Sequence, residues 1–114
     1  MNSKDLALDC MRFADNRKGE QIIALEVKKV TSIADYFVIC SGTSEPHLRA
    51  ILNEIEEQVF LKYHQHPLAE DGISGSGWVV LDYGDVLVHI MREDTRQRYD
   101  LETFWGDAPR LELK

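Results

Sequence analysis

Cysteine is scarce in this chain, since only Cys10 and Cys40 occur among its 114 residues and they form no C-x-x-C motif. Two buried free thiols in a reducing compartment are therefore a better interpretation than a disulfide bond. The first five residues lead into no apolar segment of the kind that a secretory signal needs. We therefore expect a cytoplasmic protein without a disulfide.

Long apolar runs are also absent, because no stretch approaches the roughly 20 residues that a membrane span requires. We expect no membrane association.

Positive charge is in deficit: 13 Lys and Arg residues against 20 Asp and Glu residues give a formal net charge of −7. So acidic a chain gains little from counterion release on nucleic acid, which argues against a broad nucleic-acid-binding surface. A basic protein is the partner that this charge favours.

What the chain does contain is typical of a folded domain. Hydrophobic residues make up 44% of the sequence and charged residues 29%, which is the balance of a globular protein rather than of a disordered one. The length suffices for one modest hydrophobic core. We therefore expect residues 1–114 to form a single domain, without repeats or linkers.

The strongest pattern lies in Trp78–Met91, where two β-branched apolar runs flank Gly84-Asp85. Glycine supplies the positive φ that a two-residue hairpin turn needs, so the pattern predicts a β-hairpin. Residues directly opposite one another point to the same face of a hairpin. Counting from the turn pairs Tyr83 with Val86, Leu81 with Val88 and Val79 with Ile90, which makes one face wholly apolar.

The opposite face of this hairpin is too apolar for a solvated surface and too polar for an ordinary core. Its residues are Trp78, Val80, Asp82, Leu87, His89 and Met91, with Arg92, Arg96 and Arg98 nearby. This composition is typical of a protein-binding hot spot. The alternative is that a C-terminal helix with Tyr99, Phe104 and Trp105 covers the face as a second core. The residues alone leave both interpretations open.

The remaining elements follow from the spacing of apolar residues. Helices are predicted at 3–17, from about 45 to 64 and at 93–105, strands at 21–27 and 35–40, and an exposed mobile loop at 65–77. The strand at 35–40 is continuously apolar, which predicts burial on both of its faces. Residues 106–114 are expected to add a short edge strand or to stay loose.

These elements follow one another in the order α-β-β-α-β-β-α. The order predicts the α/β class, with a single domain in which helices flank a mixed β-sheet of four or five strands. A long helix joins the strand at 35–40 to the hairpin. Because such a crossover returns the chain in the same direction, that strand should run parallel to one strand of the hairpin.

The turn Ser41-Gly42-Thr43-Ser44 is the first candidate for chemistry, because it lies between a strand end and a helix start. Backbone amides in this position can hold a phosphate group. The turn lacks the glycine patterns of phosphate-binding loops, however, and no lysine follows it. A helix capped by Thr43 or Ser44, with Gly42 in the turn, explains the same residues and is the interpretation that we favour.

Asp82 and Asp85 are the second candidate, since nucleotidyltransferases hold magnesium with paired carboxylates on one strand. In that pattern the acids are two residues apart, whereas here they are three apart and Asp85 falls in the hairpin turn. A nucleotide- or magnesium-dependent transferase that uses Ser41, Asp82 and Asp85 is the alternative function. His64 and His66 lie in an acidic loop, which favours a solvated surface over a metal site. We expect no catalytic residue, no cofactor and no metal ion.

Three blocks of the sequence resemble one known family. They are Asp35–Ser44 together with His47, Trp78–Met91 and Arg96–Ala108. In this order and at this length they are similar to the bacterial ribosomal silencing factors, the Iojap family. The similarity runs from the first helix to Ala108, and Phe104 stands where the family often has leucine.

The resemblance implies a translation repressor without enzymatic activity. Such proteins bind the large ribosomal subunit through its fourteenth protein, where the small subunit would dock, and so block subunit joining. The resemblance also implies a nucleotidyltransferase-like fold without the catalytic acids and little direct contact with ribosomal RNA. Together with the hairpin register, it predicts the partner-binding residues Trp78, Val80, Asp82, Leu87, His89, Met91 and Arg96. A homodimer in solution is a further expectation, because the same apolar face can pair with itself.

Overall fold

One strand, Tyr36–Gly42 (β2), lies near the middle of the fold, and all of its residues are buried. The computed structural model describes residues 2–72 and 75–113. In it, β2 pairs antiparallel with Glu20–Glu26 (β1) and parallel with Val86–Arg92 (β5). The burial predicted from the continuous apolar run is confirmed, and so is the parallel pairing predicted from the crossover helix.

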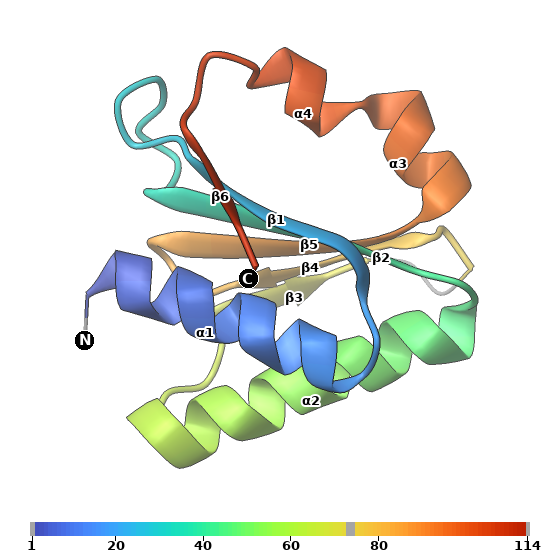
Figure 1. Ribbon diagram of the computed structural model, residues 1–114. Coiled ribbons are helices and arrows are strands. Elements are labelled where there is room, and N and C mark those ends of the chain that lie inside the picture. The colour runs from blue at the N-terminus through green and yellow to red at the C-terminus, as the bar shows by residue number, and fades with distance from the viewer. Residues whose placement is uncertain (1, 73–74, 114) are drawn as a thin grey trace.

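The complete sheet has six strands in the order β3-β4-β5-β2-β1-β6 (Figure 1). The three further strands are Ala69–Asp71 (β3), Trp78–Asp82 (β4) and Arg110–Glu112 (β6). The α/β class and the mixed sheet are confirmed. The number of strands is six, where the sequence predicted four or five.

The extra strand is β3, in a stretch that the sequence predicted to be an exposed loop. All three of its residues are exposed, so no alternation of buried and exposed positions marks it as a strand. Pairing with β4 at the edge of the sheet gives it its conformation. Residues 73 and 74 of the expected loop lie outside the described residues. At the other edge β6 pairs with β1, so the edge-strand alternative for the C-terminal tail is correct.

The hairpin of β4 and β5 has the register that the sequence predicted. Leu81 pairs with Val88 and Val79 with Ile90, and the Tyr83 amide donates to the carbonyl of Val86 at 2.9 Å. The turn between them is made by Gly84, whose φ of +87° lies in the region that favours glycine. The counted register is therefore confirmed.

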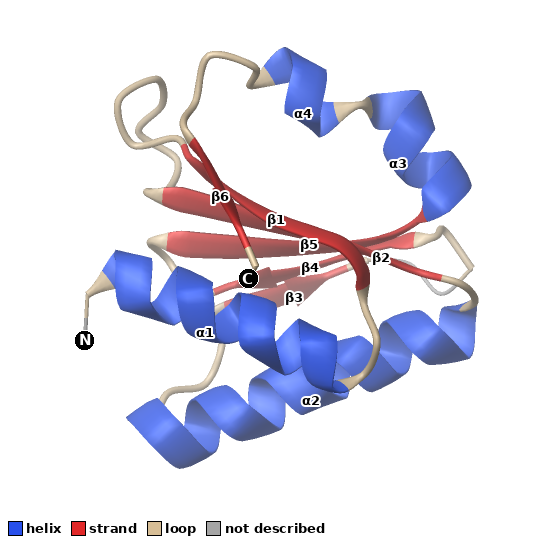
Figure 2. Ribbon diagram, in the orientation of Figure 1, coloured by secondary structure: helices blue, strands red, loops and turns tan. Residues whose placement is uncertain are grey.

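Two long helices, Ser3–Asn16 (α1) and Glu45–Tyr63 (α2), cover one face of the sheet (Figure 2). They bury the apolar face of the hairpin in the larger of two hydrophobic cores. Among the side chains of this core are Leu6, Cys10, Ala14, Ile51, Ile55, Val79, Leu81, Val88 and Ile90. The apolar stripe predicted for the first helix thus faces the sheet.

The helix ends are stabilised largely as the sequence indicated. Asn2 caps α1, and Ser44 caps α2 by accepting the amide N–H of His47 at 3.2 Å. After α1, however, the residue with positive φ is Lys18, at 61°. Gly19 follows this left-handed residue and donates its amide to the carbonyl of Ala14 at 3.0 Å.

A buried carboxylate joins the two long helices. Asp9 of α1 accepts hydrogen bonds from Arg12 at 2.7 Å, from Lys62 of α2 at 2.8 Å and from the Tyr63 hydroxyl. Burial opposes ionisation of Asp9, but these partners outweigh it and hold the pKa of the carboxyl below its ordinary value. The charged network therefore fixes the end of α2 against α1.

Two short helices, Glu93–Tyr99 (α3) and Leu101–Phe104 (α4), lie over the opposite face of the sheet (Figure 1). The sequence predicted a short helix or two helical turns here, and Asp100, with a φ of 45°, divides the stretch into two helices. Under this layer lies the smaller core, formed by Ile23, Leu25, Val27, Ala34, Phe37, Ile39, Met91 and Ala108. Two layers of unequal size therefore cover the sheet.

Leu81→Ala should destabilise the fold strongly, because Leu81 is fully buried in the larger core. We expect a loss of roughly 2–5 kcal/mol in the free energy of unfolding, measured by urea titration. Leu61→Ala is the matched control, since Leu61 lies on α2 with 61% of its surface exposed. It should change the free energy by less than about 0.5 kcal/mol. Equal losses for the two variants would contradict the assignment of Leu81 to the core.

Candidate protein-binding face

The hairpin brings six of the seven predicted site residues onto one face of the sheet. In register, Trp78 lies opposite Met91, Val80 opposite His89 and Asp82 opposite Leu87. These six residues form what we call the mixed face. The seventh, Arg96, comes from α3, which begins directly after β5.

The C-terminal helices cover only half of the mixed face. Met91 is fully buried, and His89 exposes 8% of its surface. Trp78, Val80, Asp82 and Leu87 stay partly exposed. The interpretation as a covered core is therefore correct for Met91 and His89, whereas for the four partly exposed residues protein binding stays a prediction. Met91 was expected among the contact residues, but it belongs to the smaller core and supports the face from below.

Arg96 was expected on the rim of the face, and this position is corrected by the structure. Only 5% of its surface is exposed. Its guanidinium donates to the hydroxyl of Ser41 at 2.9 Å and to the carboxylate of Glu102 at 2.7 Å. Arg96 thus ties α3 and α4 to the end of β2. A buried charge is tolerated here because it is paired and hydrogen-bonded.

A row of aromatic rings crosses this side of the sheet. Adjacent ring centroids are separated by 5.5 Å between Trp105 and Phe37, 5.1 Å between Phe37 and His89, 5.9 Å between His89 and Trp78, and 4.8 Å between Trp78 and Tyr99. The row joins both short helices to strands β2, β4 and β5. Within it, the indole N–H of Trp78 donates to Nδ1 of His89 at 3.1 Å.

A pocket of about 310 Å³ opens beside Trp78. It is lined by Asp71, Gly72, Ser76, Trp78, Val80, Thr95 and Tyr99. Sequence analysis did not place Asp71, Thr95 or Tyr99 in the site. Asp71 was missed because β3 was missed, and Tyr99 was read only as a residue available to pack. Yet 52% of the Tyr99 surface is exposed, so this ring forms an open wall of the pocket.

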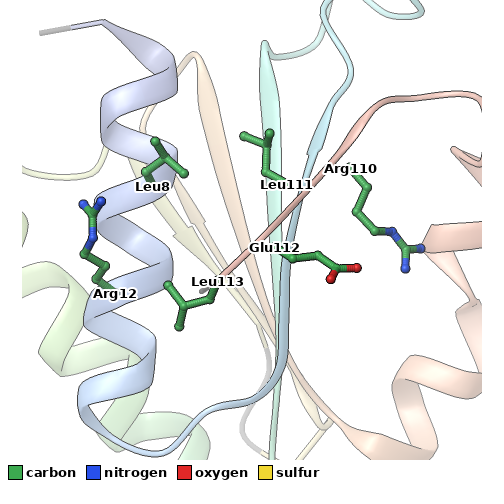
Figure 3. A pocket seen from close by; sticks show the side chains of 6 residues that line it. All are labelled: Leu8, Arg12, Arg110, Leu111, Glu112 and Leu113. Atoms are coloured by element: carbon green, nitrogen blue, oxygen red, sulfur yellow. The ribbon is translucent and has the colours of Figure 1, made fainter.

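A second hollow, of about 400 Å³, lies on another part of the molecule, between α1 and β6. Figure 3 shows Leu111 and Leu113 pointing toward α1, from which Leu8 and Arg12 line the other side. Arg110 and Glu112 extend from the opposite side of β6 (Figure 3). None of the predicted site residues lies in this groove, so it is separate from the mixed face.

The residues of the transferase alternative have structural partners. Asp82 accepts the amide N–H of Gly84 at 2.7 Å, which is an ordinary turn contact. Ser41 is fully buried and holds Arg96. Within residues 2–72 and 75–113, no group of three or more His, Cys, Asp or Glu side chains is placed to hold a metal ion. Asp82 and Ser41 are thus engaged in structural contacts.

The phosphate-binding alternative and the His64–His66 stretch are also explained by local packing. The amide of Thr43, which a phosphate would need, donates to Nδ1 of His47 at 2.9 Å. His66 stacks on Phe60 with ring centroids 4.6 Å apart, and the His64 ring meets the same phenylalanine edge-on at 6.0 Å. These histidines therefore pack around an aromatic side chain.

The two cysteines are free and buried, as predicted. Burial raises the pKa of the Cys40 thiol to about 12 and that of Cys10 further still, so neither is a reactive thiolate. Among the helices that the structure describes, none is both long and apolar enough to cross a membrane.

Acid should weaken the fold through His89, because burial lowers the pKa of its imidazole to about 4. The unfolded chain binds the proton more readily than the native state, so stability falls as the pH drops from about 6.5 toward 4. We expect this histidine to account for about 3 kcal/mol between pH 7 and pH 4. Urea titrations at both pH values, on the wild type and on His89→Asn, measure it. An equally large loss in the variant would contradict the assignment.

Comparison with known proteins identifies the family. The family described as "Ribosomal silencing factor during starvation" matches residues 1–114. The ribosomal silencing factor of Halalkalibacterium halodurans is 38% identical over 118 residues, which cover 100% of this chain and 97% of the relative. That of Bacillus subtilis is 38% identical over 113 residues, covering 99% of this chain and 95% of the relative. A mouse relative, named for mitochondrial assembly of the ribosomal large subunit, is 34% identical over 103 residues, covering 89% of this chain and 44% of its own.

Solved structures agree with this result. A crystal structure of a Chromobacterium violaceum protein has a TM-score of 0.87 at 27% identity and covers 93% of this chain and 88% of its own. One from Bacillus halodurans has a TM-score of 0.78 at 35% identity and covers 98% of this chain and 100% of its own. The family description names a silencing factor and not an enzyme, as the failure of the transferase pattern also indicates. The chain belongs to the ribosomal silencing factor family.

Proposed function

We propose that this protein represses translation by binding the large ribosomal subunit through its fourteenth protein, so that the small subunit is unable to dock. Membership of the family supports ribosome silencing as the general role. The observation that carries the proposal for this chain is the open half of the mixed face, where Trp78 and Val80 line a pocket. A partly exposed tryptophan at a pocket wall is the kind of anchor that dominates protein interfaces.

The contact residues that we propose are those that stay accessible. Trp78, Val80, Asp82 and Leu87 meet the partner, and Tyr99 joins them from α3. His89, Met91 and Arg96 act from beneath, since all three are buried. An apolar side chain of the partner fits the pocket beside Trp78 and Tyr99, whose rings lie against each other and present aromatic carbon to it.

Charge favours a basic protein as this partner. The formal net charge is −7, and the exposed carboxylate of Asp71 lines the pocket. Negative potential near the contact accelerates docking of a positively charged protein surface and repels RNA phosphates. We therefore propose little direct contact with ribosomal RNA and action in the cytoplasm, where ribosomes are found.

A homodimer in solution is part of the proposal. The open half of the mixed face is an apolar patch that a second copy can cover, because a two-fold interface uses the same surface on both subunits. In that arrangement the dimer and the ribosome compete for Trp78. Adding large subunits should then shift the free protein from dimer to monomer, as measured by analytical ultracentrifugation.

Trp78→Ala should weaken binding strongly while the fold persists. Truncation of an interface tryptophan commonly costs at least about 2 kcal/mol, which corresponds to roughly a thirtyfold loss of affinity. Co-sedimentation with purified large subunits in a sucrose gradient measures binding, and far-ultraviolet circular dichroism reports the fold. Phe60→Ala is the control, since Phe60 is an exposed aromatic residue on α2, in the helical layer away from this face. It should co-sediment as the wild type does.

Two outcomes would contradict this placement of the interface. If folded Trp78→Ala still co-sediments with the large subunit, the contact lies elsewhere. If Trp78→Ala unfolds as Leu81→Ala is expected to do, Trp78 is a core residue and the C-terminal helices protect it.

Asp85→Asn separates the proposed function from the transferase alternative. Asp85 is an exposed residue of the hairpin turn, so its charge should matter little to binding of the large subunit. We expect the variant to co-sediment normally, and we expect calorimetry of the wild type with ATP and magnesium to give no heat at micromolar protein. Loss of function in a folded Asp85→Asn variant, or saturable heat, would favour the transferase.

A further inference from the structure

The polar centre of the aromatic row is His89, which lies between Phe37 and Trp78. Its ring meets Phe37 edge-on, with an interplanar angle of 72°. On the backbone it is flanked by Ile39 of β2 and Val80 of β4. Neighbours on the two adjacent strands, β2 and β4, therefore confine the ring, and its Nδ1 atom is presented to the indole of Trp78 at a fixed point.

We propose that His89 is a positioning residue, which fixes by its hydrogen bond the edge of the Trp78 indole that the ribosomal partner meets. This inference rests on the proposed function of the mixed face. Trp78 is partly exposed. Its ring meets that of Tyr99 from α3 with centroids 4.8 Å apart, but an apolar ring contact does not distinguish the N–H edge of the indole from its carbon edge. The bond to His89 directs the polar N–H edge inward. The opposite, wholly carbon edge then faces the pocket and the partner.

The hydrogen bond also sets the protonation of the histidine. Because Nδ1 accepts from Trp78, the ring hydrogen of the neutral imidazole is on Nε2. That atom is buried and has no hydrogen-bond partner among the described residues. A buried donor without a partner lowers stability. An apolar residue at this position would avoid that cost, which argues that His89 serves the orientation of Trp78 and not the stability of the sheet.

Burial supports the same role, since it keeps the imidazole neutral at physiological pH. A protonated ring would carry hydrogen on both nitrogen atoms and would oppose the indole N–H with a second donor. Toward Trp78, the Nδ1 atom of His89 thus serves only as a hydrogen-bond acceptor. His89 is one of the residues that made this face too polar for an ordinary core. Its role is explained as the hydrogen-bond acceptor for the indole N–H, the one polar group of the Trp78 side chain.

The first test uses the wild-type protein and needs no variant. Nitrogen-15 NMR distinguishes the two neutral tautomers of a histidine, and we expect the His89 hydrogen on Nε2. A scalar coupling between Nδ1 of His89 and the indole nitrogen of Trp78 should be observable across the hydrogen bond. Trp78→Phe assigns the resonance, since Trp105 is the other tryptophan of the sequence. A hydrogen on Nδ1 would overturn the inference.

The second test compares two variants of different chemistry. His89→Phe keeps a ring of similar shape but removes the acceptor, whereas His89→Asn places an oxygen close to the position of Nδ1. We expect exchange of the Trp78 indole hydrogen to be roughly tenfold faster in His89→Phe, as loss of one hydrogen bond implies. Affinity for the large subunit should fall by a similar factor. His89→Asn should stay within about threefold of the wild type in both measurements, since one hydrogen bond is retained.

The outcomes distinguish this inference from the function on which it rests. The positioning role would be overturned if exchange of the Trp78 indole hydrogen is unchanged in His89→Phe. It would also be overturned if this exchange is accelerated equally in both variants. If the indole loosens only in His89→Phe and yet Trp78→Ala binds the large subunit normally, His89 does orient Trp78 but the proposed interface is wrong. The inference holds if His89→Phe changes both the indole exchange rate and the affinity, while His89→Asn leaves both close to their wild-type values.

Discussion

The burial of β2 on both faces is the constraint on which the rest of the structure depends. A strand of apolar side chains on both sides requires cover above and below the sheet. The long helices α1 and α2 supply it on one face. On the other face the cover comes from α3, α4 and the residues that lead to β6, and at its margin Trp78 of β4 is only partly buried. The exposed half of the mixed face is a consequence of this unequal cover.

Arg96 links that cover to the sheet. Its guanidinium joins Ser41, at the end of β2, to Glu102, in α4. The buried residues of α3 are Thr95 and Arg96, and α4 has none, so the contacts of the Arg96 guanidinium fix the position of both helices against β2. The same contact occupies the serine that a transferase would have needed. In this chain the residues that resemble a nucleotide site serve the architecture of a binding protein.

The two polar side chains Asp82 and His89 of the mixed face each accept one hydrogen bond from a nearby residue. Asp82 holds the hairpin turn through Gly84, and His89 holds the indole of Trp78. With these atoms satisfied, what the face offers outward is largely apolar, beside the carboxylate of Asp71. Such a surface suits a basic protein with an apolar side chain to bury. It suits the phosphate backbone of RNA poorly.

The sequence by itself determined the local elements, because periodicity, turn residues and caps act over a few positions. Gly84 and the alternation around it set the hairpin register, the apolar run at 35–40 predicted a strand buried on both faces, and Thr43 or Ser44 marked the start of α2. Only the tertiary structure decided which segments cover which face of the sheet. β3 has three exposed residues and becomes a strand only by pairing with β4. Met91 and Arg96 were predicted to bind the partner. They are buried instead, because the chain turns back over them at Asp100. Burial of a face of the sheet depends on the length and direction of segments that are distant in sequence. The spacing of residues within that face does not predict either property.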